Sequence, residues 1–174
     1  MKYLVKFFVV TFLFLIYTHA SAEQKIAYLD MKFVLNNSKA GKGAQDFLQK
    51  SFKENQKIFL DEENTLKKNE NDLLAQKTIL TKKEYQKKSD DLRKKVIDYQ
   101  SQRRTALEKI TSQRAEARQK LLEKLDPIMK TYIKENDISL IIDRKNVLMG
   151  NTNLDITNII VEKLNKEFPS LSIK

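Results

Sequence analysis

The hydrophobic pattern of this chain consists of two short apolar segments with a long charged segment between them. The residues KIAYLD (25–30) alternate, with Ile26 and Tyr28 on the face opposite to Leu29, as in a half-buried strand. The run ISLIID (138–143) is equally strand-like and is the most apolar run after the amino terminus. These segments predict two β-strands that belong to one small body although they lie far apart in the sequence.

The segment between the predicted strands favours a long helical arm. No glycine or proline occurs in residues 44–126, which are rich in Lys, Glu, Gln, Asp, Asn and Leu. Because glycine and proline are the residues that interrupt helices most strongly, a segment without them is typical of continuous helix. We therefore expect an arm at 44–125 and a body made of 23–43 and 126–174.

A seven-residue apolar period marks the first half of the arm. It runs through Phe52, Phe59, Leu66, Leu73 and Leu80, and seven is the period of a coiled coil. The positions three residues after the first four of these are all polar: Asn55, Glu62, Asn69 and Gln76. The predicted apolar seam is therefore only half as wide as a stable coiled coil requires.

The period breaks near residue 80, where a capping-box sequence begins with Thr81 as N-cap and Glu84 at the N3 position. A second apolar stripe follows, with spacings of mostly three and four: Tyr85, Leu92, Val96, Tyr99, Ala106, Ile110, Leu121, Leu122 and Leu125. The break lies near the middle of the insert, which favours two antiparallel helices with a tip near 77–85. One straight helix that dimerises with another chain is the alternative.

The amino terminus is typical of an export signal. Lys2 and Lys6 precede an apolar run at 7–17, and residues 20–22 have the small-x-small pattern that signal peptidase recognises. The run is short compared with the roughly 20 residues of a membrane-spanning helix. We expect a cleaved signal peptide at 1–22, and an uncleaved membrane anchor is the alternative.

Composition argues against most enzyme classes for the expected mature chain, 23–174. The full chain has a net charge of +10, which becomes +8 when Lys2 and Lys6 are removed; it has no Cys, and its single His, His19, lies in the expected signal peptide. Without imidazole or thiol the common general base, nucleophile and zinc or haem ligands are missing. Three glycines in the whole chain are too few for a glycine-rich phosphate loop. We expect no enzymatic activity, no catalytic or metal-binding residues and no cofactor.

Charge is unevenly distributed along the arm. Residues 54–72 contain six acidic residues and three lysines, whereas residues 77–95 contain eight basic residues and three acidic ones. The predicted tip is therefore basic and would attract anionic partners through its long-range field. The candidate residues for binding a client or an anionic surface are Lys82, Lys83, Lys87, Lys88, Lys94 and Lys95. A solvated face that only keeps the protein soluble is the alternative.

The carboxy-terminal body is expected to hold a third strand at 147–149 and an amphipathic helix capped by Asp155. Pro127 either begins a new helix capped by Asp126 or kinks the returning arm. Three short strands and one helix cannot bury a sufficient core alone, which predicts an oligomer. The candidate core and oligomer-interface residues are Ile26, Tyr28, Leu29, Leu140 and Ile142.

With these segments in this order, the chain resembles the Skp/OmpH family of periplasmic chaperones. The resemblance is strongest in KIAYLDMKFVL (25–35) and in residues 136–164, especially DISLIID (137–143) and DIT (155–157), and the arm agrees in length and character. It implies an α+β, mostly α fold: a small β-containing trimerisation body with a long antiparallel helical-hairpin arm. It also implies a periplasmic homotrimer whose three arms enclose unfolded outer-membrane proteins without ATP.

Two function classes remain open, and a third is disfavoured. The chain could be a holdase, with unfolded outer-membrane β-barrel proteins, further copies of itself, and anionic lipid or lipopolysaccharide as partner classes. It could instead be an exported structural or tethering coiled-coil protein of the cell envelope that binds one folded partner. The net charge also suggests nucleic-acid binding, but export and the lack of interleaved exposed aromatic residues argue against it, so no nucleic acid is expected.

Overall fold

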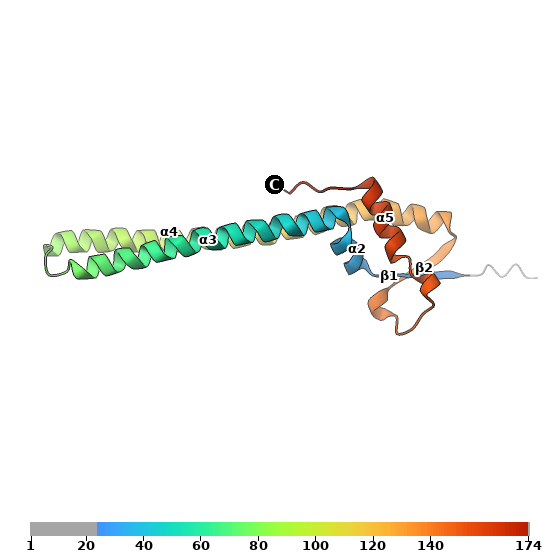
Figure 1. Cartoon of the computed structure of the whole chain (residues 1–174), viewed down its shortest axis with the longest axis horizontal. Coiled ribbons are helices and arrows are strands. Elements are labelled where there is room, and N and C mark those ends of the chain that lie inside the picture. The colour runs from blue at the N-terminus through green and yellow to red at the C-terminus, as the bar shows by residue number, and fades with distance from the viewer. Residues whose placement is uncertain (1–23, 174) are drawn as a thin grey trace, which may run out of the picture.

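The computed structural model describes residues 24–173 and shows a long helical hairpin that extends from a small body (Figure 1). The expected signal peptide and its alternative lie outside the described residues. Within the described part of the chain, no helix combines the length and the apolar character needed to cross a membrane. The predicted α+β, mostly α fold class is confirmed.

The sheet of the body pairs two segments from opposite ends of the sequence. Strand β1 (Lys25–Leu29) and strand β2 (Ile138–Asp143) are parallel, and Ile26 is the register partner of Leu140. Two consecutive parallel strands require a long crossover connection, and here that connection is the whole arm. The two strands predicted from the apolar segments are therefore confirmed.

The predicted third strand at 147–149 is wrong. After β2 the chain forms a short 3-10 helix, η1 (Arg144–Asn146), then an irregular loop and a second one, η2 (Thr152–Leu154). On β1 the backbone of Tyr28 already forms an isolated parallel bridge with Asp155, and its carbonyl accepts the N–H of Ile156 at 3.0 Å. Residues 147–149 pair with neither strand of this sheet and form part of the loop.

A tight corner between two helices starts the arm. Helix α2 (Met31–Asn37) is capped by Asp30, whose side chain accepts the N–H of Phe33, and helix α3 (Lys39–Ala75) is capped by the buried Ser38. Ser38 Oγ accepts the N–H of Gly41 at 3.1 Å. Helix α3 therefore begins five residues before the position 44 that the glycine-free segment predicts.

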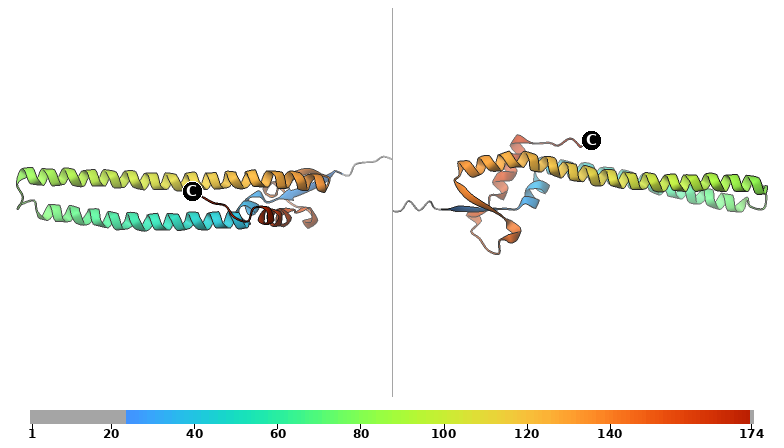
Figure 2. Two further views of the ribbon diagram at one scale, coloured as in Figure 1. Left: turned by 90° about the horizontal axis from the view of Figure 1, so that it is seen from above. Right: turned by 180° about the vertical axis from the view of Figure 1, so that it is seen from behind.

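Helix α4 (Lys82–Glu135) returns along α3 and then enters the body. Figure 2 shows from two directions that the two helices lie side by side along the arm. The capping box is confirmed: Glu84 N–H donates to Thr81 Oγ1 at 3.3 Å, and Thr81 N–H donates to Glu84 Oε2 at 3.1 Å. The hairpin is therefore confirmed, and the single straight helix is wrong.

Pro127 lies inside α4, so the alternative in which it begins a separate helix is wrong. A proline within a helix removes one N–H donor and therefore one backbone hydrogen bond. Its neighbours Leu125 and Ile128 are 1% and 3% exposed, and this burial offsets part of that loss. Because α4 belongs to both arm and body, the division of the chain at 125 remains a proposal.

The core of the body lies where α2, the ends of α3 and α4, the sheet and helix α5 (Thr157–Glu167) meet. Its buried residues are Ala27, Leu29, Val34, Leu35, Ala40, Leu121, Leu125, Ile128, Ile156, Ile160 and Leu164. Only the inner face of the two-stranded sheet contributes to this core, since Ala27 and Leu29 are buried while Ile26 is 44% exposed. The opposite face of the sheet is left open.

Candidate functional site

The seam between α3 and α4 alternates apolar and polar positions. Phe59, Leu66 and Leu73 are half-buried on α3, as the seven-residue period predicts. The polar positions between these residues are also half-buried: Asn55, Glu62, Asn69 and Gln76. The seam therefore has the full width of a coiled-coil contact, but every second layer contributes little apolar burial.

Phe52 departs from the predicted seam. Its side chain is 45% exposed, whereas Leu48 is buried and Ser51 and Asn55 are half-buried. The line of contact with α4 runs through these three residues near the base of the arm. Phe52 consequently lies at the side of the seam. The seven-residue apolar period continues to Phe52, but the contact with α4 at this height of the arm is made by the preceding residue, Ser51.

Burial along α4 increases from the tip toward the body. Leu92 and Val96 are half-buried, Tyr99 and Ile110 are 8% and 7% exposed, and Leu121 is 4% exposed. Of the α4 stripe predicted from the sequence, Leu122 departs from this gradient, because it is 37% exposed. The gradient indicates that local opening costs least free energy near the tip and most at the base of the arm.

A cluster around Tyr99 occupies the middle of the arm. The rings of Phe59 and Tyr99 meet edge to face, with centroids 6.0 Å apart, and Tyr99 Oη donates to Glu63 Oε2 at 3.4 Å. Lys67 donates to the same glutamate, with its Nζ 2.7 Å from Oε1. This hydrogen bond and the charge of Lys67 lower the pKa of Glu63, and the same pair raises the pKa of Lys67. Both groups are exposed to water, so the pair orients Glu63 more than it stabilises the fold.

The six predicted lysines of the tip are all exposed. Lys88 Nζ donates to Gln76 Oε1 at 2.7 Å and so bridges the two helices at a polar layer of the seam. Among the described residues, none of the six takes part in an ion pair. The tip therefore presents positive charge to solvent.

The open face of the sheet brings four of the five predicted interface residues together. Ile26 and Leu140, which are register partners, are 44% and 53% exposed, and Tyr28 and Ile142 form the next half-buried pair of partners. Leu29 differs, because it points to the other face and is only 2% exposed in the core. It is a core residue of the single chain, and its placement in an oligomer interface is wrong.

A loop beside this face was missed as a candidate surface. Leu148 and Met149 are 100% and 94% exposed, while a Cβ added to the next residue, Gly150, would lie 3.1 Å from the ring of Tyr28. The sequence signal was present as an apolar pair directly before a Gly-Asn-Thr-Asn loop. We interpreted that pair as a strand rather than as an exposed apolar surface.

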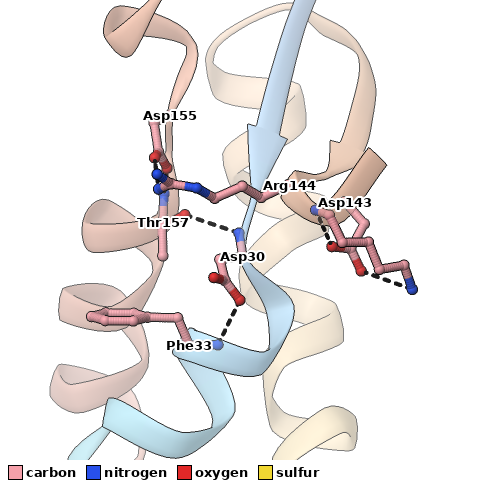
Figure 3. A network of polar contacts seen from close by, with 7 residues as sticks. Asp30, Phe33, Asp143, Arg144, Asp155 and Thr157 are labelled. Atoms are coloured by element: carbon pink, nitrogen blue, oxygen red, sulfur yellow. Dashed lines mark hydrogen bonds and ion pairs between the residues drawn. The ribbon is translucent and has the colours of Figure 1, made fainter. Parts of the chain in front are cut away.

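Polar contacts hold this loop against the rest of the body (Figure 3). Arg144 Nη1 donates to Asp155 Oδ2 at 2.8 Å, and Asp155 Oδ1 accepts the N–H of Thr157 at 2.9 Å. Thr157 Oγ1 in turn accepts the N–H of Asp30. Asp155 therefore binds the first N–H of α5 as the sequence suggests, although the N-cap position itself is Ile156.

In residues 24–173 no group of three His, Cys, Asp or Glu side chains is placed to hold a metal ion. The features that distinguish the molecule are surfaces: a basic tip, a mixed helical seam, and an open apolar sheet face.

Comparison with known proteins assigns the family. The family model for outer membrane protein (OmpH-like) matches residues 25–164, which is most of the chain. The chain belongs to the OmpH-like family. A search of curated proteins finds no match. The family resemblance inferred from the strand segments is therefore confirmed.

A solved structure shares the architecture of this OmpH-like chain. It is a candidate outer membrane chaperone (OmpH-like) from Caulobacter crescentus CB15, with a TM-score of 0.81 and 18% sequence identity. The likeness covers 90% of this chain and 93% of the other. At this identity the comparison establishes the shared fold of body and hairpin arm.

Proposed function

We propose that this OmpH-like chain is an ATP-independent periplasmic holdase chaperone. It binds unfolded outer-membrane proteins and prevents their aggregation during transit to the outer membrane. The observation that carries the proposal is the arm itself, a long hairpin with a mixed seam and a basic tip that extends from a small body. Family membership and the name of the similar solved protein support the same role.

The arm suits a client that has no fixed shape. Unfolded barrel strands expose alternating apolar residues that would otherwise pair and aggregate. Apolar side chains are about half exposed along both arm helices, for example Leu60 and Leu74 on α3 and Leu107 on α4. Many weak contacts made together provide avidity without a single tight site. Release would follow when the client reaches a more stable folded state in the membrane, so no nucleotide is required.

Self-association is part of the proposal. The open sheet face pairs Ile26 with Leu140 and Tyr28 with Ile142, and apolar surface of this kind is commonly covered by a partner. We propose that the body forms a homotrimer through this face, so that the arms surround one cavity. A set of arms would hold a client more securely than a single arm, because simultaneous contacts raise the effective concentration.

We further propose that the chain reaches the periplasm after cleavage of residues 1–22. In that compartment the basic tip would meet acidic segments of clients first, with anionic lipid or lipopolysaccharide as a second class of partner. The exposed lysines of the tip support both attractions.

Aggregation suppression tests the function. A denatured β-barrel protein is diluted into buffer with or without the mature chain, and light scattering is followed. A holdase suppresses scattering near stoichiometric ratios, and it does so for several unrelated barrels. A tethering protein would leave scattering unchanged and would instead bind one folded envelope protein, which would refute the proposal.

A further inference from the structure

The middle of the arm has a groove on one side of the hairpin. A cleft of about 460 Å³ lies between the two helices and is lined in part by Phe52, Phe59 and Leu60 of α3. A shallow, open depression of about 680 Å³, lined by α4 alone, continues past Leu107. Both include Tyr99 and Arg103, so they adjoin each other on the same side of the arm. We call the two together the mid-arm groove.

Apolar side chains in this groove are available to a partner. Phe52, Leu60 and Leu107 are 45%, 55% and 46% exposed, while Tyr99 is held in place by its contacts with Phe59 and Glu63. Because Phe52 lies beside the seam, its aromatic ring is exposed at the rim of the groove. In the predicted coiled-coil position the same ring would be buried.

The charge of the groove selects for acidic partners. Four basic side chains line it against two acidic ones, Glu63 and Glu108. The basic residues are Lys53, Lys57, Arg103 and Arg104. Among the described residues none of these four takes part in an ion pair, whereas Glu63 is already paired with Lys67. The charge of Arg103 also helps to lower the pKa of Glu63, so Lys53, Lys57 and Arg104 are the cations most available to an anionic side chain that entered the groove.

We propose that the mid-arm groove binds an extended polypeptide segment in which apolar or aromatic side chains alternate with acidic ones. This inference rests on the proposed function and names a specific contact site for the client. Tyr99 and Leu107 are eight residues apart on one helix, or about 12 Å at 1.5 Å per residue. An extended segment covers that distance in roughly four residues and directs every second side chain to the same face. The first and third apolar side chains, four residues apart, would then reach Tyr99 and Leu107, and the long Lys and Arg side chains of the rim would meet the acidic ones between them.

A membrane surface is a poorer match to this groove. The groove lies on the side of the hairpin, so its lining residues cannot contact a flat bilayer at the same time. Two of these residues, Glu63 and Glu108, would also repel an anionic lipid surface. The tip lysines are better placed for such a surface. The groove and the tip are therefore expected to respond differently to vesicles and peptides.

The test compares two double variants of the chain without residues 1–22. Leu60→Ser with Leu107→Ser removes one exposed apolar side chain of the groove from each helix. Ile58→Ser with Ile97→Ser is the matched control, because these residues are 59% and 57% exposed on the same helices but line neither part of the groove. Far-ultraviolet circular dichroism and sedimentation check that both variants keep the fold and assembly of the parent chain.

The probe is a fluorescent peptide with alternating Phe and Asp, measured by anisotropy, and a second peptide in which Lys replaces Asp. We expect the groove variant to bind the Phe–Asp peptide about tenfold more weakly, since two partly exposed leucines are lost, and the control variant to change by less than about twofold. The parent chain should favour the Asp peptide over the Lys peptide, and Arg103→Gln with Arg104→Gln should reduce this preference.

Three results would overturn the inference. The first is an equal loss of affinity for the Phe–Asp peptide in both double variants, and the second is no loss of that affinity in either. The third is a groove variant that loses binding to anionic phospholipid vesicles while its peptide affinity is unchanged. Aggregation suppression is measured on the same proteins to separate the two proposals. If the parent chain protects denatured barrels but the groove variant binds the peptide normally, the groove inference fails and the holdase proposal stands.

Discussion

Gly41 of α3 packs directly against the backbone carbonyl of Leu35 in α2. A Cβ added to Gly41 would overlap that oxygen and would also approach Ser38 Oγ at 2.9 Å. The contact sets the corner between the two helices, because the chain passes from α2 into α3 through the single buried residue Ser38. The direction in which the arm leaves the body therefore depends on a residue that has no side chain.

We predict that Gly41→Ala destabilises the chain by about 2–3 kcal/mol, because the new methyl group forces the helices apart. The matched control is Gly43→Ala in the same helix, where a Cβ meets nothing within 4 Å. That change should stabilise the chain by about 0.5–1 kcal/mol through the higher helix propensity of alanine. Urea denaturation followed by circular dichroism measures both, and equal effects of the two substitutions would contradict the close packing at Gly41.

The open sheet face predicts the effect of a charge on assembly. Leu140→Asp should dissociate the proposed trimer, since an unpaired carboxylate in an apolar interface costs on the order of several kcal/mol. The single chain should keep its helical content, because Leu140 is 53% exposed outside its own core. Sedimentation velocity measures the assembly state.

Ser101→Asp is the control for this substitution. It places the same charge on an exposed position of α4 in the arm, outside the sheet. We expect this variant to sediment like the parent chain. A Leu140→Asp chain that remains assembled would show that the sheet face is not the interface.

The burial gradient of the seam predicts graded mobility along the arm. Amide hydrogen exchange should be fast from about Gln76 to Leu92, intermediate near Tyr99, and slow near Leu121 and in β2. The reason is that half-buried polar layers near the tip give way to residues less than a tenth exposed toward the base. Exchange measured by mass spectrometry that is uniform from tip to body would mean that the arm is a rigid rod.

Positive charge at the tip predicts a salt-dependent rate of capture. Lys82→Gln, Lys83→Gln and Lys87→Gln together should slow association with an acidic unfolded client by about tenfold at low salt, and the difference should shrink as salt rises. Stopped-flow fluorescence measures the rate. Lys42→Gln, Lys134→Gln and Lys166→Gln remove the same charge from exposed positions outside the tip and should have a smaller effect. Equal rates for the two triple variants would indicate that only net charge matters.

The capping box at the tip predicts a local pH response. Hydrogen bonds from the Thr81 hydroxyl and backbone lower the pKa of Glu84 below its ordinary value of 4.5. A carboxyl whose pKa is lowered by folding stabilises the folded form above the unfolded pKa, and this contribution is lost as pH falls through the lower folded pKa. The first turn of α4 should therefore loosen only below about pH 4.5.

Nuclear magnetic resonance titration of the Glu84 side chain tests this response. Its midpoint should lie below 4.5, and Thr81→Ala should move it back toward that value, because the largest cause of the shift is removed. A Glu84 midpoint that is the same in the parent chain and the variant would show that the capping box is not maintained in solution.

The sequence by itself determined the elements of this OmpH-like chain. Alternation in 25–30 and the apolar run at 138–143 predicted both strands, the segment without glycine or proline predicted the arm, and Thr81 with Glu84 predicted where the hairpin turns. These signals are local, because strand alternation, helix propensity and capping depend on residues within a few positions of one another.

Tertiary structure decided which faces are buried and which remain open. Phe52 fits the seven-residue period, yet packing at the base of the arm places it beside the seam, and Leu29 continues the strand alternation but fills the core of the single chain. The segment at 147–149 is apolar enough for a strand, yet it pairs with neither β1 nor β2 and remains a loop. Each outcome depends on contacts between segments far apart in the sequence, which a local pattern of residues does not contain.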